Sequence, residues 1–294
     1  MPINESQLNT WSHQGAITGS AETYRIIRQV LDSCPAYASQ NYDIFLQGSY
    51  GNQTNIYAES DVDIVIRLDS TFFQDVSALP ENQLTAYNAA YSTASYPYPQ
   101  FQADVLAHLR SAFGSSVRPG SKAIKIDGNG SRRNADVVVA AQYRRYTSFR
   151  NLIDQSYETG IRFVTRDGAE IVNYPKQHSA NCTSKHAATG QRFKPMVRVL
   201  KNMRKRMVAE GWLEDGVAPS YFLEGLLYNV PSTAFRNSFG ETFVNAMRWI
   251  RAADRTQFVC ANEQHYLIRD TQITWPVANA DRFITQAIAY WDQA

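Results

Sequence analysis

The stretch Leu46-Gln-Gly-Ser-Tyr-Gly51, followed at Ser60-Asp-Val-Asp-Ile-Val-Ile66, decides the fold expected for this chain. The first segment sets a Gly-Ser turn after an apolar strand, and the second places two aspartates one residue apart on another apolar strand. Because side chains alternate faces along a strand, Asp61 and Asp63 point the same way while Val62 points the other. Neighbouring carboxylates repel each other, so the pattern favours a divalent cation and a phosphate-bearing substrate.

A third carboxylate is expected to complete this site. Two metal ions about 3.5–4 Å apart need more ligands than two monodentate acids supply. Asp136 lies on a predicted strand at residues 134–140, and pairing of that strand with residues 61–68 would bring all three acids to one edge of the sheet. Asp61, Asp63 and Asp136 are therefore the predicted catalytic residues and the predicted ligands of two Mg²⁺ or Mn²⁺ ions.

This site implies an in-line displacement at the alpha phosphorus of a nucleotide, with pyrophosphate leaving. One ion would bind the triphosphate and the other would lower the pKa of the attacking hydroxyl. Asp136 is either the general base or the ligand that orients the hydroxyl. Gly48, Ser49 and the backbone amides that follow would hold the outer phosphates, because small residues let the backbone approach an anion. In the competing interpretation, Gly48-Ser49 is an ordinary turn, Asp61-Val-Asp63 ends a strand, and Asp136 is a solvated surface acid.

The rest of the chain predicts an α+β protein with a mixed sheet, an N-terminal helical segment and a C-terminal helical lobe. Residues 4–31 predict one long helix or two short ones. Further strands are expected at residues 43–47, in a meander at 121–126, 135–141 and 143–149, and in a pair at 162–164 and 170–172. Helices are expected at residues 83–91, 101–113, 191–210, 220–229, 241–253 and 281–291.

These elements divide the chain into a catalytic core over residues 1–175 and a helical lobe over residues 176–294, with the active-site cleft between them. The turn residues Asp127-Gly-Asn-Gly130 favour a hairpin inside the meander, and Arg166-Asp-Gly168 favours a turn between the last two strands.

Composition excludes several classes of protein. The 294 residues are 44% hydrophobic and 19% charged, with a net charge of +2, which is typical of a globular protein. No apolar run reaches the roughly 18 residues that a membrane span needs, and the N-terminus lacks the pattern of a signal peptide. Three scattered cysteines argue against a disulfide framework. We expect a cytoplasmic protein with no membrane partner.

A cationic segment follows at residues 191–208, which carry seven lysines and arginines and no acid. On a helix, Lys194, Arg198, Lys201 and Lys205 would share one stripe while apolar residues share another, so the cationic face could look into a cleft. The alternative is a solvated helix face.

The residues Gly48-Ser49, Asp61-Val-Asp63 and Asp136 resemble the signature of the polymerase-beta-like nucleotidyltransferase superfamily. The segments at residues 192–204 and 219–224 resemble those of the cGAS/DncV-like nucleotidyltransferases, or CD-NTases. These enzymes belong to bacterial anti-phage (CBASS) signalling and are relatives of animal cyclic GMP-AMP synthase. The similarity spans nearly the whole chain.

This resemblance implies an enzyme that joins two or three nucleoside triphosphates into a cyclic oligonucleotide, which then activates a separate effector. It also implies that Lys201 and Ser220 hold the donor triphosphate and that Tyr221 stacks on a base. The competing interpretation of Tyr221 is a core aromatic beside Phe222. We expect a structural role for Glu224. The chain lacks the paired-cysteine ribbon of the animal enzyme, so activation by double-stranded DNA is not implied. We expect a monomer without a sequence-specific nucleic-acid partner.

Other functions remain open. A nucleotidyltransferase of the same superfamily could modify a protein, an RNA end or a small molecule. A catalytically silent nucleotide sensor could keep the fold, although the three acids argue against it. A nucleic-acid-binding module would use the basic helix but leave the acids unexplained. Separately, His178, Cys182 and His186 are spaced four and four, so they could offer three ligands to zinc or fill core and surface positions.

Overall fold

The computed structural model describes residues 3–15, 17–57, 61–271 and 273–293. By their internal contacts the residues group into two compact units. The sheet unit comprises Thr18–Gln47 and Ser60–Pro175, and the lobe unit comprises Met1–Ile17, Gly48–Glu59 and Lys176–Ala294. The domain limits expected from the sequence stay a prediction. The contact grouping has a break at the same place, between residues 175 and 176, and places two earlier segments with the C-terminal region.

The sheet unit is built on a mixed sheet, which confirms the predicted α+β fold. Its strands run in the order β1-β2-β5-β4-β3, and β6 and β7 continue from β5. The central pair, β2 with β5, is parallel, and the other neighbouring pairs are antiparallel. The strands are β1 (Tyr42–Leu46), β2 (Val62–Asp75), β3 (Val117–Pro119), β4 (Ile124–Ile126), β5 (Ala135–Phe149), β6 (Gln155–Val164) and β7 (Glu170–Asn173).

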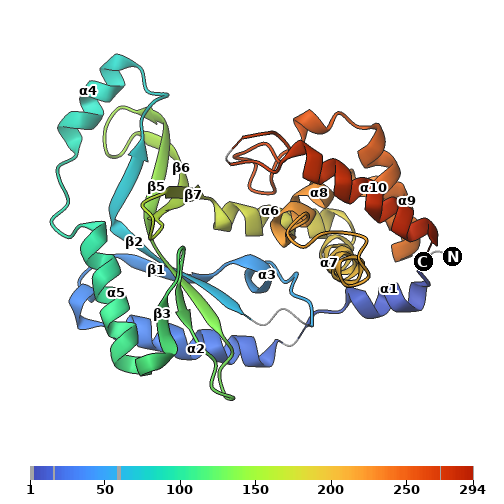
Figure 1. Cartoon of the computed structure of the whole chain (residues 1–294). Coiled ribbons are helices and arrows are strands. Elements are labelled where there is room, and N and C mark those ends of the chain that lie inside the picture. The colour runs from blue at the N-terminus through green and yellow to red at the C-terminus, as the bar shows by residue number, and fades with distance from the viewer. Residues whose placement is uncertain (1–2, 16, 58–60, 272, 294) are drawn as a thin grey trace. The chain divides into compact units, whose positions relative to one another are not determined.

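The central strands are the most buried part of this unit. Ile64, Val65 and Ile66 of β2 are fully buried, as expected where a parallel pair of β-branched residues is covered on both faces. The helices α2 (Thr18–Asp32) and α5 (Tyr98–Phe113) contact each other and β2 (Figure 1). The side chain of Tyr98 donates a hydrogen bond to the Val139 carbonyl at 2.8 Å, which ties α5 to β5.

A smaller cluster closes the other end of the sheet unit. Tyr87 of α4 (Glu81–Ala90) packs edge-to-face against Tyr146 and Phe149 of β5. The short 3₁₀ turns of this unit are η1 (Pro35–Tyr37) and η2 (Gly114–Ser116).

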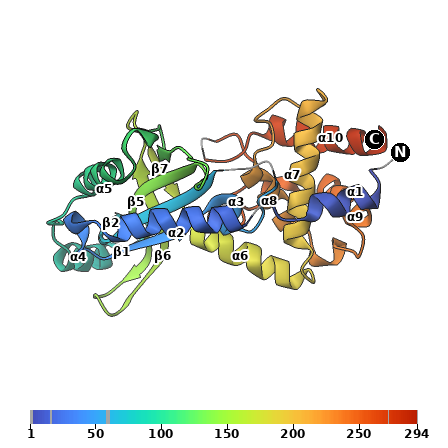
Figure 2. The ribbon, with the colours of Figure 1, turned by 90° about the horizontal axis from the view of Figure 1, so that it is seen from below.

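The lobe unit surrounds α7 (Phe193–Ala209), which contacts α1, α8, α9 and α10. Figure 2 shows α1 beside α7 and α9. The apolar residues Leu200, Met203 and Met207 of α7 are buried in the core of this unit. The other helices are α1 (Glu5–Ser12), α3 (Gly48–Gly51), α6 (Pro175–Ala188), α8 (Ser220–Asn229), α9 (Phe239–Ala252) and α10 (Val277–Gln293), with the 3₁₀ turns η3 (Ser232–Ala234) and η4 (Arg255–Gln257).

Most predicted elements are present, with some corrections. The N-terminal region forms the two helices α1 and α2, and residue 16 lies outside the described part of the chain. The hairpin between β4 and β5 and the pair of β6 with β7 are confirmed. The predicted break at residue 142 is wrong, because β5 is continuous through a buried Gln142 that accepts a hydrogen bond from Arg144 Nε at 2.6 Å. The second and third strands of the predicted meander are therefore one long strand. The first is confirmed as the shorter β4, which pairs with β3, a strand that the sequence did not predict.

None of the helices in the described residues has the length and apolar character needed to cross a membrane.

Candidate active site

The acids lie at the start of the two central strands of the sheet unit. In the parallel pair, Asp63 of β2 lies opposite Asp136 of β5, and the Val62 amide donates to the Asn134 carbonyl at 2.9 Å. Asp61 immediately precedes β2 and is exposed, whereas Asp63 and Asp136 are half-buried. The strand pairing predicted from the sequence is therefore present.

The surroundings of Asp136 make its negative charge costly. Burial raises the pKa of Asp136, the charge of Asp61 raises it further, and the charge of Lys125 opposes the shift. Lys125 lies opposite Asp136 on β4. A bound divalent cation would relieve the repulsion, and carboxylate oxygens are the ligands that Mg²⁺ prefers. The donor set therefore fits a magnesium site.

Among the described residues, one group of three potential metal ligands has its ligand atoms within 4.8 Å of one another, namely His178, Cys182 and Glu224. The three aspartates do not form such a group.

The Gly-Ser segment forms one tight helical turn, α3, in the lobe unit. Gly48 has a φ of +62°, a backbone conformation that glycine adopts without steric cost. Two backbone hydrogen bonds close the turn. The Asn52 amide donates to the Gly48 carbonyl at 3.0 Å, and the Thr54 amide donates to the Ser49 carbonyl at 2.8 Å.

The cationic face of α7 binds the chain that follows this turn. Arg198 Nη1 donates to the Gln53 carbonyl at 2.6 Å, and Lys201 Nζ donates to the Thr54 carbonyl at 2.9 Å. Lys194 Nζ donates to Gln53 Oε1 at 3.2 Å. Lys194, Arg198 and Lys201 are buried, so a solvated helix face is the wrong interpretation for these three residues. Lys205, the fourth member of the stripe, is exposed.

Ser220 and Tyr221 begin α8, after Pro219 at the N-cap. The side chain of Tyr221 is 40% exposed whereas the adjacent Phe222 is fully buried, so Tyr221 is not a core aromatic. Its ring stacks on His178 with centroids 5.2 Å apart and planes 26° apart. Tyr221 is thus an aromatic ring supported from within the unit and accessible to solvent.

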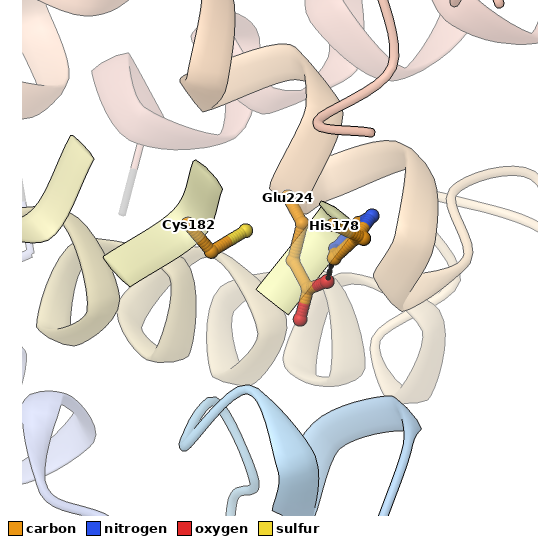
Figure 3. A group of neighbouring side chains, drawn as sticks. All are labelled: His178, Cys182 and Glu224. Carbon is orange, nitrogen blue, oxygen red and sulfur yellow. Dashed lines mark hydrogen bonds and ion pairs between the residues drawn. The ribbon is translucent and has the colours of Figure 1, made fainter. Parts of the chain in front are cut away.

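A buried polar cluster, drawn in Figure 3, includes the His178 ring that stacks on Tyr221. His178 and Cys182 from α6 approach Glu224 from α8, and His178 Nε2 is 2.6 Å from Glu224 Oε2. Burial and the charge of Glu224 raise the pKa of the Cys182 thiol. His186 is not a member, because its Nδ1 accepts the Lys194 amide at 3.3 Å.

The zinc trio suggested by spacing is therefore not assembled. Sequence reasoning placed Glu224 among structural residues and did not connect it with His178. The available signal was a single acid inside the apolar run Phe222-Leu-Glu-Gly-Leu-Leu227, since a carboxylate buried on a helix needs partners.

A mixed sheet with paired acids at its edge, accompanied by a glycine turn and a helical unit, is the architecture of a nucleotidyltransferase. The family model of the cGAS/DncV-like nucleotidyltransferase C-terminal helical domain matches residues 180–292. A cyclic UMP-AMP synthase from Rhodothermus marinus is 37% identical over 99% of this chain and 98% of the relative. The cyclic nucleotide synthase CdnE01 from Staphylococcus haemolyticus is 36% identical over the full length of both chains.

The solved structures give the same result. The Rhodothermus marinus CdnE c-UMP-AMP synthase with Apcpp and Upnpp superposes with a TM-score of 0.89 at 37% identity, covering 99% of this chain and 97% of that one. The Elizabethkingia meningoseptica CdnE cyclic dinucleotide synthase with GTP and Apcpp superposes with a TM-score of 0.78 at 29% identity, and the match covers 98% of each chain. The chain therefore belongs to the cGAS/DncV-like nucleotidyltransferases, and it is an enzyme of that class.

Proposed function

We propose that this chain is a Mg²⁺-dependent synthase that joins nucleoside triphosphates into a cyclic di- or trinucleotide, releasing pyrophosphate. The observation that carries the proposal is the register that sets Asp63 opposite Asp136 with Asp61 just before the strand. The curated relatives named above make cyclic nucleotides, and they match this chain over nearly its whole length.

In this proposal Asp61, Asp63 and Asp136 hold the divalent cations. When bound, Mg²⁺ or Mn²⁺ neutralises phosphate charge and lowers the pKa of the attacking hydroxyl. Asp136 also orients that hydroxyl or accepts its proton.

The lobe unit supplies the nucleotide-binding groups. Gly48 and Ser49 present backbone amides and a hydroxyl to the outer phosphates. Lys201 adds positive charge and Ser220 a hydroxyl for the donor triphosphate, while the exposed ring of Tyr221 stacks on a base. Binding of this kind orients the alpha phosphorus for in-line attack.

The product would act on a separate effector in anti-phage (CBASS) signalling, and we propose that the enzyme works as a monomer. The second candidate function is transfer of a nucleotide to a protein, an RNA end or a small molecule, which would need the same acids.

The test is incubation of the purified protein with Mg²⁺ and the four labelled nucleoside triphosphates. We expect a product that resists phosphatase, because a ring has no terminal phosphate, and whose mass equals two or three nucleotide units. The double variant Asp61→Asn with Asp63→Asn should lose the product and keep its melting temperature. The exposed pair Arg150 and Asp154 gives a matched control, since Asp154→Asn removes a carboxylate that is remote from this edge.

The competing outcomes are distinct. A linear product or a label attached to a macromolecule would support the second candidate. Nucleotide binding without turnover in any metal would indicate a sensor. An unchanged product in the double aspartate variant would refute the assignment of the metal site.

A further inference from the structure

Glu224 is a carboxylate buried in the lobe unit. Its side chain is 3% exposed and lies on α8 between the fully buried residues Leu223 and Leu226. A charged carboxylate in such surroundings is costly unless it is fully hydrogen-bonded. The partners of Glu224 therefore indicate what this residue does.

Two hydrogen-bond donors to Glu224 come from the segment after the Gly-Ser turn. Asn52 Nδ2 donates to Glu224 Oε2 at 3.0 Å, and the Thr54 hydroxyl donates to Glu224 Oε1. A third donor is His178 Nε2, at 2.6 Å from Oε2. Both carboxylate oxygens thus accept hydrogen bonds, and α8 is tied to the segment that follows α3.

Thr54 transmits this contact to the phosphate-binding turn. Its hydroxyl is bound by Glu224, its carbonyl accepts Lys201 Nζ at 2.9 Å, and its amide donates to the Ser49 carbonyl at 2.8 Å. Thr54 is fully buried. The position of Ser49 therefore depends on a residue held by a buried anion on one side and a buried cation on the other.

The same carboxylate also fixes the aromatic ring at the start of α8. His178 is 5% exposed, and its bond to Glu224 sets the angle of the imidazole on which Tyr221 stacks. His178 Nδ1 is buried without a hydrogen-bond partner in the described structure, so the bond from Nε2 is what orients this ring. One carboxylate thereby orders two groups with separate roles in nucleotide binding.

The cluster could also be a metal site, because Cys182 lies within 4.8 Å of the other two ligands. The geometry argues against this. A separation of 2.6 Å between His178 Nε2 and Glu224 Oε2 is a hydrogen-bond distance, and both oxygens already accept hydrogen bonds. Metal ligands of one tetrahedral ion would stand farther apart.

We propose that Glu224 is a positioning residue for nucleotide binding, whose carboxylate holds the phosphate-binding turn and the His178–Tyr221 ring pair as one preorganised surface for a nucleoside triphosphate. The inference rests on the proposed function, because it takes Ser49 and Tyr221 as contacts of the nucleotide. Preorganisation of this kind lowers the entropic cost of binding. Glu224 itself touches no substrate in this scheme.

The test compares Thr54→Val, Thr54→Ser and Glu224→Gln with the wild type. Each of the four ribonucleoside triphosphates is titrated calorimetrically with Mg²⁺, and KM and kcat are measured for those that react. Thr54→Val keeps the shape and the carbonyl but loses the hydroxyl, so we expect Kd and KM to rise about tenfold or more, as loss of a hydrogen bond to a charged group implies. The change in kcat should be smaller. Thr54→Ser should restore the wild-type values.

A matched control separates this role from general stability. Thr242 is equally buried in the same unit, on α9, and its hydroxyl donates to the Ser238 carbonyl at 2.9 Å. Thr242→Val should lower the melting temperature without raising Kd or KM. Hydrogen exchange followed by mass spectrometry should show faster exchange of residues 48–57 in Thr54→Val and Glu224→Gln and wild-type exchange there in Thr242→Val.

Wild-type Kd and wild-type exchange of the turn in Thr54→Val would overturn the inference. Stoichiometric zinc in the purified protein that is lost in Cys182→Ser would also overturn it, since Glu224 would then be a ligand. If the wild type binds nucleotide but makes no cyclic product, the proposed function fails, and the change in Kd still supports the role of Glu224. If the wild type binds none of the four nucleotides, both fail.

Discussion

Two buried cationic side chains of this protein donate hydrogen bonds to backbone carbonyls. The sequence pattern indicated only that these positions carry positive charge. Lys201 and Arg198 are buried beside the Gly-Ser turn and donate to carbonyls of the segment that follows it. Burial lowers the pKa of Arg198 to about 10, which leaves it charged at neutral pH. A buried cation that is hydrogen-bonded in this way imposes one loop conformation, because an alternative would leave the charge unpaired.

His186 provides the residue-scale prediction. Burial and the charges of Lys194 and Arg198 lower the pKa of His186 to about 4, from an ordinary value of 6.5. The unfolded chain therefore binds a proton at this site that the folded chain does not bind between these two pH values. The contribution of neutral His186 is complete above pH 6.5 and is lost as the pH falls toward 4.

We expect the melting temperature to fall between pH 6.5 and pH 4.5 and the fall to be shallower in His186→Asn, which keeps an acceptor near the Lys194 amide. Calorimetric scans across this range make the comparison. The exposed His13 is the matched control, and His13→Asn should keep the wild-type slope. Equal slopes in wild type and His186→Asn would contradict the prediction.

At the scale of elements, two arginines of α7 are expected to contribute differently to the free energy of unfolding. Arg198 Nε donates to the Ser12 carbonyl at 2.5 Å and Nη1 to the Gln53 carbonyl at 2.6 Å, whereas Arg206 pairs with Glu210 one turn along an exposed face. Arg198→Met should lower the free energy of unfolding by roughly 3 kcal/mol, because hydrogen bonds to a buried charged group are lost.

Arg206→Met is the control on the same helix. An exposed pair spaced four residues apart contributes less than about 1 kcal/mol, so this variant should unfold nearly as the wild type does. Urea titration followed by far-UV circular dichroism measures both values. A loss in Arg198→Met no larger than that in Arg206→Met would show that the contacts of Arg198 with the loop do not stabilise the fold.

Local patterns predicted the elements that depend on local chemistry. The apolar run at residues 62–68 and the turn residues 127–130 were sufficient for β2 and for the hairpin, because burial and positive φ angles select those residue types. The continuity of β5 was not predictable, since it depends on a bond between Gln142 and Arg144. Helix α6 has few apolar residues, and its burial follows from tertiary contacts of His178 and Cys182 rather than from periodicity.

In the candidate site, the pairing of the acids was predictable from the sequence, whereas the cluster around Glu224 was not. The pairing of Asp63 with Asp136 follows from two apolar strands that must share a core. The cluster around Glu224 joins residues 52–54, 178 and 224, which are distant in the sequence. Only the fold brings them together, so single-sequence spacing pointed to His186 instead.

At the scale of the whole molecule, the groups proposed to bind metal and those proposed to bind nucleotide belong to different compact units. The acids lie in the sheet unit, while the Gly-Ser turn, Lys201 and Tyr221 lie in the lobe unit. Each set is supported by its own contacts: strand pairing for the acids, and the buried Glu224 and Lys201 for the turn.

Removal of metal should therefore stop catalysis without unfolding the protein. With excess EDTA we expect no product and a melting temperature within about 1 °C of the value before chelation, because the strands that carry the acids are closed by backbone hydrogen bonds. Mg²⁺ together with a non-hydrolysable triphosphate should raise the melting temperature, since a ligand that binds only the folded state stabilises it by about 2.7 kcal/mol at a hundredfold excess over Kd. Asp63→Asn should lose much of this increase and Asp154→Asn none of it. A large drop in melting temperature on chelation would instead identify a structural metal, for which the His178–Cys182–Glu224 cluster would be the first place to look.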